Sequence, residues 1–287
     1  MIVTRGVIRT GTPAVPAFSR KGLPRLMATL RRAVQTLFIL IVALGLPPHV
    51  VAQEEPPPEE PPIVSRAVVP VVGQREGFAG ILWRSDVALH NDSPEAVTIV
   101  VSPLPIPELF QMRTLAPGES VVLENVAADS FGIGRGVTPL LIQTLARRSV
   151  TIYATAYGIL EGRPTPRQII PVLYDELPPS IQQLSSLAMN ESLRTNIGLV
   201  NLGDEPAMFT LALQRLAGRP LATQALIVPP TSSVHLPLNT LFPLVTEGDD
   251  LTLLVDTLAA RTYAYASVVR NDTHEAYFIQ PRIMMVR

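Results

Sequence analysis

The chain has 287 residues, of which 47% are hydrophobic and 16% are charged, with a formal net charge of −1 and no cysteine. This composition can form buried cores, so it excludes a chain that is disordered throughout, and the absence of cysteine excludes disulfide bonds. Residues 1–52 hold seven basic residues and no acidic one, so the remainder has 16 basic and 24 acidic residues, a net charge of −8. Nucleic-acid binding needs a basic surface, so we expect no nucleic-acid partner.

Residues 27–52 have the three parts of a secretory signal peptide in the expected order. Arg31 and Arg32 form the positive region, an apolar run of ten residues covers 37–46, and a cleavage site with small or modest side chains ends at Ala52. A bilayer span needs about 20 apolar residues, so this run is too short. We therefore expect export, with no membrane span after signal-peptide cleavage; an uncleaved anchor is the alternative.

The segments on either side of the signal peptide do not have a globular pattern. Residues 1–26 precede the signal peptide. We therefore expect Met27 to be the true start of the protein, with a long n-region as the alternative. Residues 1–52 are taken together as an N-terminal extension and signal peptide. The stretch QEEPPPEEPP (53–62) is acidic and rich in proline, which favours an extended polyproline form. We expect a linker over residues 53–66.

From residue 67 onward, short apolar runs alternate with turn residues, which is typical of β-strands. Residues 81–90 alternate with a period of two, which predicts a strand that buries one face. The expected inner face consists of Trp83, Ser85, Val87 and Leu89, and the expected outer face of Arg84, Asp86, Ala88 and His90. About seven such strands over residues 67–174 favour an antiparallel sandwich.

The same pattern occurs a second time later in the chain. Residues 84–103 align with 194–213, and LLIQTLARRS (140–149) matches LLVDTLAART (253–262) at six of ten positions. The intervening stretch LAPGESVVL corresponds to VPPTSSVHL, so the order of the blocks is kept. We infer a duplicated unit of about 100 residues, which is a usual domain size. The second copy is expected at 181–287, with one helical turn within 237–244.

Both copies resemble bacterial immunoglobulin-like sandwich modules of the cell-adhesion-related or alpha-galactosidase-associated type. The resemblance is carried by LHNDSPEAVTIVV with LAPGESVVL in the first copy, and by LVNLGDEPAMFTLAL with VPPTSSVHL in the second, which lacks the Gly-Glu pair. With WRSD (83–86) and LRTNIG (193–198), the whole chain resembles secreted bacterial proteins built from two such units. The resemblance implies an all-β fold of two tandem antiparallel immunoglobulin-like sandwiches, and export, and it supplies no catalytic residue.

The usual catalytic and metal-binding patterns are not found after the signal peptide. The three remaining histidines, His90, His235 and His274, form no zinc motif, and the glycines of FGIGRGVTP lack the lysine of a phosphate loop. Asp249 and Asp250 could ligate calcium, but their spacing matches no known loop. We expect no cofactor, no metal site and no enzymatic activity.

Two sets of side chains are candidates for binding. Arg84, Asp86, Arg194 and Asn196 occupy matching outward positions of the two copies and could form an interaction surface or a simple cross-strand polar ladder. Five tyrosines lie in late strands, where such residues bind sugars or peptides when exposed and are more often half-buried: Tyr153, Tyr157, Tyr263, Tyr265 and Tyr277.

The sequence therefore predicts a secreted, non-enzymatic binding or structural module at the cell surface, in the periplasm or elsewhere in the envelope. Its expected partner is a protein or polysaccharide of the cell envelope. One alternative is a periplasmic two-domain assembly chaperone, although such chaperones use a lysine that residues 53–287 lack. The other alternative is an exported hydrolase with an unrecognised site.

Overall fold

The computed structural model describes residues 65–145, 150–174, 180–215 and 220–284, all within one compact unit that spans 60–287. These residues are almost entirely antiparallel strands with a few short helical turns, which confirms the all-β prediction. The expected signal peptide and residues 53–64 of the expected linker lie outside the described residues. Among the residues described, no helix is long and apolar enough to cross a lipid bilayer.

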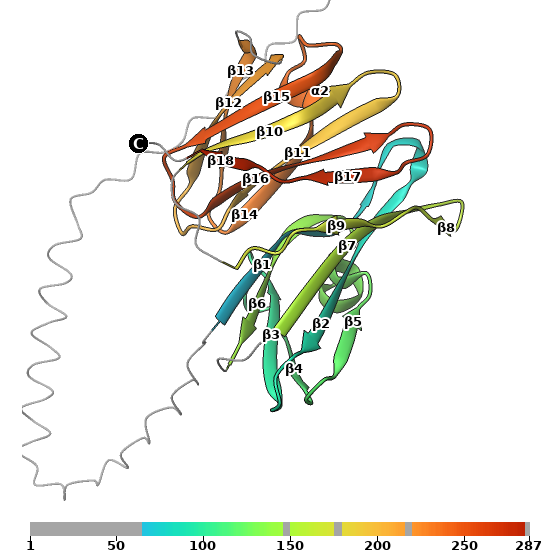
Figure 1. The fold of residues 1–287 in the computed structure, drawn as a ribbon, viewed down its shortest axis with the longest axis vertical. Coiled ribbons are helices and arrows are strands. Elements are labelled where there is room, and N and C mark those ends of the chain that lie inside the picture. The colour runs from blue at the N-terminus through green and yellow to red at the C-terminus, as the bar shows by residue number, and fades with distance from the viewer. Residues whose placement is uncertain (1–64, 146–149, 175–179, 216–219, 285–287) are drawn as a thin grey trace, which may run out of the picture. The chain divides into compact units, whose positions relative to one another are not determined.

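Within the residues that the structure describes, the first half of the unit contains nine strands and two short helical turns (Figure 1). The strands are β1 (Ser65–Glu76), β2 (Leu82–Asn91), β3 (Val97–Pro103), β4 (Gln111–Leu115), β5 (Ser120–Leu123), β6 (Gly136–Thr144), β7 (Val150–Leu160), β8 (Arg163–Pro164) and β9 (Gln168–Ile170), and the helical turns are η1 (Phe78–Gly80) and η2 (Val126–Ser130). One layer has the order β4-β3-β6-β1. The end of β1 continues into the second layer, where it pairs with β2. In that layer β2 pairs with β5 and β7, and β7 also pairs with β8 and β9.

The described part of the second half also contains nine strands, with one short α-helix. The strands are β10 (Ser180–Met189), β11 (Leu193–Asn201), β12 (Ala207–Arg215), β13 (Pro220–Val228), β14 (Ser232–Pro237), β15 (Gly248–Thr257), β16 (Thr262–Arg270), β17 (Ala276–Ile279) and β18 (Arg282–Met284), and the helix is α2 (Leu238–Leu241), at the expected helical turn. Its sheets have the orders β13-β12-β15-β10-β18 and β14-β11-β16-β17. The second half thus repeats the strand order of the first.

Each half has its own hydrophobic core, because alternate residues of its strands face the space between two sheets. Val87, Leu89 and Ile99 are fully buried in the first core, and Phe209 and Leu253 in the second. The expected inner face of residues 81–90 is correct for Ser85, Val87 and Leu89. Strand β4 was not predicted, because most of its side chains are exposed and its sequence, QMRTL, has no alternation.

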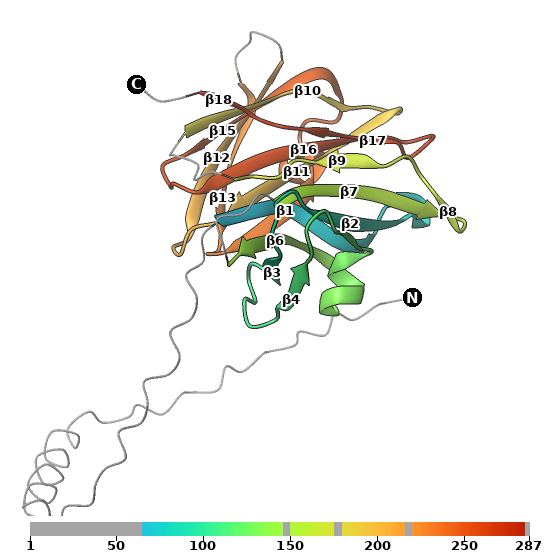
Figure 2. The same ribbon diagram turned by 60° about the horizontal axis from the view of Figure 1, so that its bottom comes forward.

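A third hydrophobic cluster joins the two halves. It consists of Leu104, Leu141, Val200, Leu202, Tyr263 and Tyr265, with partly buried side chains such as Leu173 and Phe278 packed against it. Strand β9 of the first half contacts β17 of the second, and both views show these strands side by side (Figure 2). The two copies therefore meet through apolar side chains.

Candidate functional site

A pocket of about 420 Å³ lies between the two halves. Strands β1, β2, β7 and β9 contribute to its lining from the first half, and β11, β14, β16 and β17 from the second. Its charged lining residues are Arg75, Arg84, Arg194 and Glu76, and its aromatic ones include Phe78, Trp83, Tyr265 and Phe278. The pocket is therefore formed only when both copies pack together.

Three of the four residues that the sequence singled out line this pocket, namely Arg84, Arg194 and Asn196. Arg84 and Arg194 occupy matching positions near the starts of β2 and β11, the strands that are equivalent in the two copies. The packing of the copies brings both arginines to one cavity, which the sequence alone did not show.

The fourth residue, Asp86, is not part of the pocket lining, and the prediction that it faces outward is wrong. Its side chain is 6% exposed, and Oδ1 accepts hydrogen bonds from the Asn125 backbone N–H at 2.8 Å and the Tyr157 hydroxyl at 3.3 Å. Arg167 Nη1 donates to Asp86 Oδ2 at 2.5 Å, while its guanidinium lies 4.2 Å from the centre of the Tyr157 ring. A carboxylate with these three partners can be buried, which an alternation pattern does not anticipate.

The Asp86 cluster also changes the electrostatics of its members. Burial, with the nearby Asp86 charge, raises the pKa of Tyr157. The hydrogen bond to Asp86 raises the pKa of Arg167, which keeps this guanidinium charged. Arg167 directly precedes Gln168, which lines the pocket, so the bond to Asp86 anchors the chain next to a lining residue.

The two arginines from matching positions differ in their contacts. Arg84 Nε is buried and has no hydrogen-bond partner within the described part of the chain. Arg194 Nη1 donates to Asn271 Oδ1 at 2.7 Å, and its guanidinium lies 5.5 Å from the centre of the Phe78 ring. Burial lowers the pKa of Arg194. Between the described residues, no ion pair joins Arg84 or Arg194 to a carboxylate.

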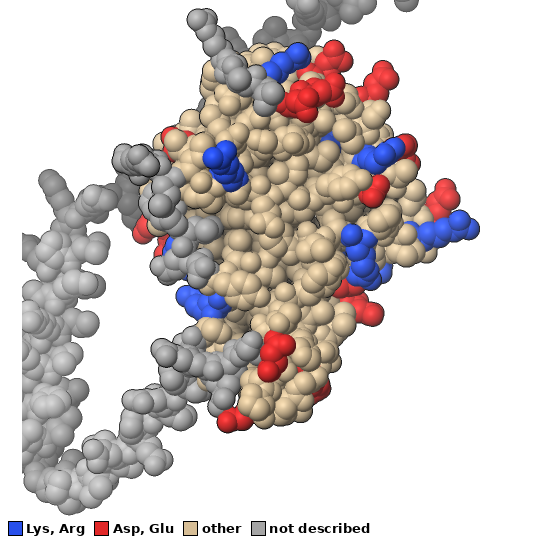
Figure 3. Space-filling model, viewed as in Figure 1, with Lys and Arg blue, Asp and Glu red and all other residues tan. Residues whose placement is uncertain are grey.

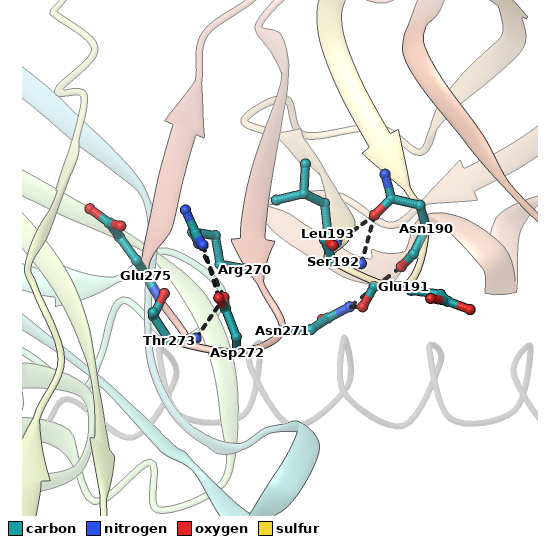
Figure 4. Close-up of polar contacts among 9 residues, drawn as sticks. All are labelled: Asn190, Glu191, Ser192, Leu193, Arg270, Asn271, Asp272, Thr273 and Glu275. Carbon is teal, nitrogen blue, oxygen red and sulfur yellow. Dashed lines mark hydrogen bonds and ion pairs between the residues drawn. The ribbon is translucent and has the colours of Figure 1, made fainter.

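Two neighbouring turns hold the partner of Arg194 in position (Figure 4). Asn271 Nδ2 donates to the Glu191 carbonyl at 2.8 Å, which ties the β16–β17 turn to the β10–β11 turn. Asn190 Oδ1 accepts from the backbone N–H groups of Ser192 and Leu193, which closes the latter turn. Asn271 Oδ1 is therefore fixed as an acceptor, and it orients the Arg194 guanidinium.

His235, on β14, also lines the pocket. Its Nδ1 lies 3.0 Å from the Tyr265 hydroxyl, and its carbonyl accepts a hydrogen bond from Arg75 Nη1 at 3.2 Å. Desolvation by the surrounding protein, together with the Arg75 charge, lowers the pKa of His235 to about 4, so the imidazole is neutral at pH 7. The Tyr265 ring stacks on Phe278 with centroids 4.8 Å apart.

Several pocket residues were missed by sequence reasoning. Trp83, the single tryptophan of the chain, was expected to face a core, and the sequence did not single out Phe78, Gln168 or Asn239 as site residues. The packing of the two copies brings these residues into one lining. The only signal in the sequence was that Trp83 is the single tryptophan of the chain. Of the five tyrosines, Tyr157, Tyr263 and Tyr265 are buried, while Tyr153 and Tyr277 are half-exposed.

A serine, a histidine and an aspartate form a second polar arrangement at the surface, away from the pocket lining. His90 Nδ1 lies 2.8 Å from Ser120 Oγ, and His90 Nε2 lies 3.4 Å from Asp92 Oδ1. His90 and Ser120 are directly opposite each other on β2 and β5, so their contact follows from sheet register. The residue types are those of a nucleophile, a base and an orienting acid.

In the view of Figure 3, charged side chains are sparse, and much of the face carries none. Within the described residues, no group of three or more His, Asp or Glu side chains could hold a metal ion. Asp249, considered above for calcium, instead accepts a hydrogen bond from Asn190 Nδ2 at 2.5 Å.

Comparisons with known proteins give little similarity. No family model matches the chain, and the search of curated proteins found no match. Among solved structures, a lectin from Pleurotus ostreatus, determined in complex with GalNAc, aligns over 82% of this chain and 80% of its own, with 11% sequence identity and a TM-score of 0.20. A similarity this weak carries no argument about fold or ligand.

Proposed function

We propose that this protein is an exported, non-enzymatic binding module of the cell surface or envelope, and that it holds its ligand in the pocket between its two halves. One observation carries the proposal: Arg84 and Arg194, from matching strands of the two copies, line a single cavity of about 420 Å³. Export is supported by the signal-peptide pattern of residues 27–52.

The size and lining of the pocket fit a ligand site. Pockets that bind small molecules have volumes of about 300–1,000 Å³, and apolar and aromatic side chains surround a few polar groups that fix the ligand's orientation. Here Phe78, Trp83 and Phe278 supply the aromatic part, while Arg84 and Asn196 are among the polar groups. A terminal or branching unit of an envelope polysaccharide would fit a cavity of this size.

Two hydroxyl groups of the pocket, those of Ser85 and Thr195, support binding over catalysis, because each is hydrogen-bonded to the backbone. Ser85 Oγ accepts a hydrogen bond from the Gly73 backbone N–H at 3.1 Å. Thr195 Oγ1, at the matching position of the second copy, accepts from the Ala188 N–H at 3.1 Å and donates to the Ala188 carbonyl at 2.6 Å. A nucleophile needs a base that takes its proton, and neither hydroxyl has one.

A retention experiment with a pocket-filling variant tests this proposal. The full-length protein is immobilised and exposed to envelope fractions of the producing cell, as wild type, Asn239→Phe and Thr240→Phe. Both residues are exposed on α2, but only Asn239 lines the pocket, so the second variant is a matched control. We expect one fraction to be retained by the wild type and the control and lost by Asn239→Phe. No retention by the wild type, or equal retention by all three, would contradict the proposal.

Ester hydrolysis is a second candidate, favoured only by the contact of Ser120 with His90 and Asp92. We rank it lower because the Ser120 side chain is exposed and these residues do not line the pocket. The test is the cleavage rate of a series of p-nitrophenyl esters by the wild type and Ser120→Ala. Equal, background rates would exclude this candidate, and a rate that falls more than about 100-fold in the variant would establish it.

A further inference from the structure

We propose that the ligand of the pocket is an acidic saccharide, in which a sugar ring of the hexuronate type places its carboxylate against Arg84 and Arg194. This inference rests on the proposed function, because it requires the pocket to be the binding site. The structural basis is the meeting of two guanidinium groups with aromatic rings and free amide groups in one cavity.

The charge of the pocket points to an anion. Its lining has three arginines and one glutamate, although residues 53–287 as a whole carry a net charge of −8. Arg84 Nε is buried without a hydrogen-bond partner among the described residues, and such groups are rare unless a ligand or water completes them. Guanidinium groups bind carboxylates through paired, charge-assisted hydrogen bonds, so a carboxylate would satisfy this donor.

The rest of the lining fits the other parts of a sugar ring. Phe78 is 65% exposed although it is a large apolar side chain, and both Phe78 and Trp83 line the pocket. A pyranose ring presents C–H groups on its faces, which pack on aromatic rings, and hydroxyl groups at its edge. The side chains of Asn196 and Asn239 line the pocket without hydrogen-bond partners in the described part of the chain, so they are available to those hydroxyls.

A peptide with a free C-terminal carboxylate shares the anionic group but fits the surroundings less well. Extended peptides are commonly bound by adding a strand to the edge of a sheet, where unpaired backbone groups are exposed. Strand β2, which carries Arg84, pairs with β5 and β7, and strand β11, which carries Arg194, pairs with β14 and β16, so each strand has partners on both sides along most of its length. The molecule that carries the carboxylate is therefore a saccharide and not a peptide.

The test compares two forms of the same saccharide by calorimetric titration of the full-length wild-type protein. The saccharide probes are tri-galacturonate and its methyl ester, with tri-mannuronate as a second acidic saccharide. The peptide probes are a pentapeptide with a free C-terminus and the same pentapeptide with an amidated C-terminus. We expect an acidic trisaccharide to bind and its affinity to fall at least tenfold on esterification. We also expect weaker binding at higher salt, because the contact is ionic.

The variants locate the contact on the protein. Arg84→Gln and Arg194→Gln are each expected to weaken binding of the acidic trisaccharide about tenfold or more, while Arg113→Gln, an exposed arginine outside the pocket, leaves it unchanged. Circular dichroism checks that each variant is folded. The comparison of acid and ester uses only the wild-type protein, so it tests the inference even if a variant does not fold.

The outcomes separate this inference from the proposed function. Equal binding of acid and ester, binding of the free peptide but not its amide, or binding of no acidic trisaccharide would each overturn the inference. In all three cases the proposed function survives if Asn239→Phe still abolishes retention of the envelope fraction. If the wild type retains no envelope fraction, the proposed function itself fails.

Discussion

Asn91 and Asn201, which align in the duplicated sequence, make the same set of hydrogen bonds in their two halves. Asn91 Nδ2 donates to the carbonyls of Glu95, Leu115 and Ala116 at 2.8, 3.1 and 3.0 Å. Asn201 Nδ2 donates to the corresponding carbonyls of the second copy at 2.7, 3.1 and 3.0 Å. Each asparagine thereby ties its own turn to the end of a later strand, β4 in the first copy and β13 in the second.

We expect Asn91→Ala and Asn201→Ala each to lower the free energy of unfolding by about 2–4 kcal/mol, because three carbonyls lose their buried donor. Denaturant-induced unfolding measures the change. Gln224→Ala is the control, since this exposed amide makes one weak bond of 3.4 Å to its neighbour's carbonyl. A loss for either asparagine no larger than for Gln224 would contradict the role described here.

Gly198 allows the Tyr265 ring to pack against β11, because a Cβ at this position would overlap the ring. We expect Gly198→Ala to destabilise the protein by about 2–3 kcal/mol through overpacking, and to displace a side chain that lines the pocket. Gly134→Ala is the matched control, since a Cβ there meets no atom within 4 Å. Thermal unfolding of both variants gives the comparison, and equal midpoints would contradict the account.

His235 should make stability depend on pH. Its pKa is lowered from 6.5 to about 4 in the folded protein, so the unfolded chain binds a proton that the folded chain does not between these values. The contribution of His235 to the free energy of unfolding is therefore fully present above pH 6.5. It is lost as the pH falls towards 4, by up to about 3 kcal/mol. Denaturant-induced unfolding at pH values from 4 to 7.5 should show that the free energy of unfolding depends less on pH for His235→Gln than for the wild type.

Asp86 should matter for stability, and not for ligand contact. Asp86→Ala leaves the Arg167 charge and the Asn125 N–H without their acceptor, although the Arg167 side chain is 52% exposed and regains water. We expect a cost of about 2 kcal/mol, at the lower end of the range for a buried pair. Asp272→Ala, which breaks an exposed pair with Arg270, should cost clearly less. Denaturant-induced unfolding of the two variants tests whether Asp86→Ala lowers the free energy of unfolding more than Asp272→Ala does.

The sequence was sufficient for most of the strands, β4 excepted, and for part of the site. Alternation identified β2 and β11 because their inner faces are apolar, and the duplication placed Arg84 and Arg194 at matching positions. Alternation failed at Asp86, because a carboxylate can be buried when residues distant in sequence, such as Arg167, supply its hydrogen bonds. The pocket itself depends on how the two copies pack, and no local pattern in one copy contains that information.

The central claim, that ligand binds between the two halves, can be tested through Trp83. It is the single tryptophan of the chain and it lines the pocket, so its fluorescence reports on this cavity alone. The wild-type protein is titrated with the saccharide fraction of the producing cell's envelope, beside Asn239→Phe and Thr240→Phe. A saturable change in Trp83 emission in the wild type and Thr240→Phe, absent in Asn239→Phe, is predicted. Retention of the fraction with no change in Trp83 emission would contradict the account, because the ligand would then bind elsewhere.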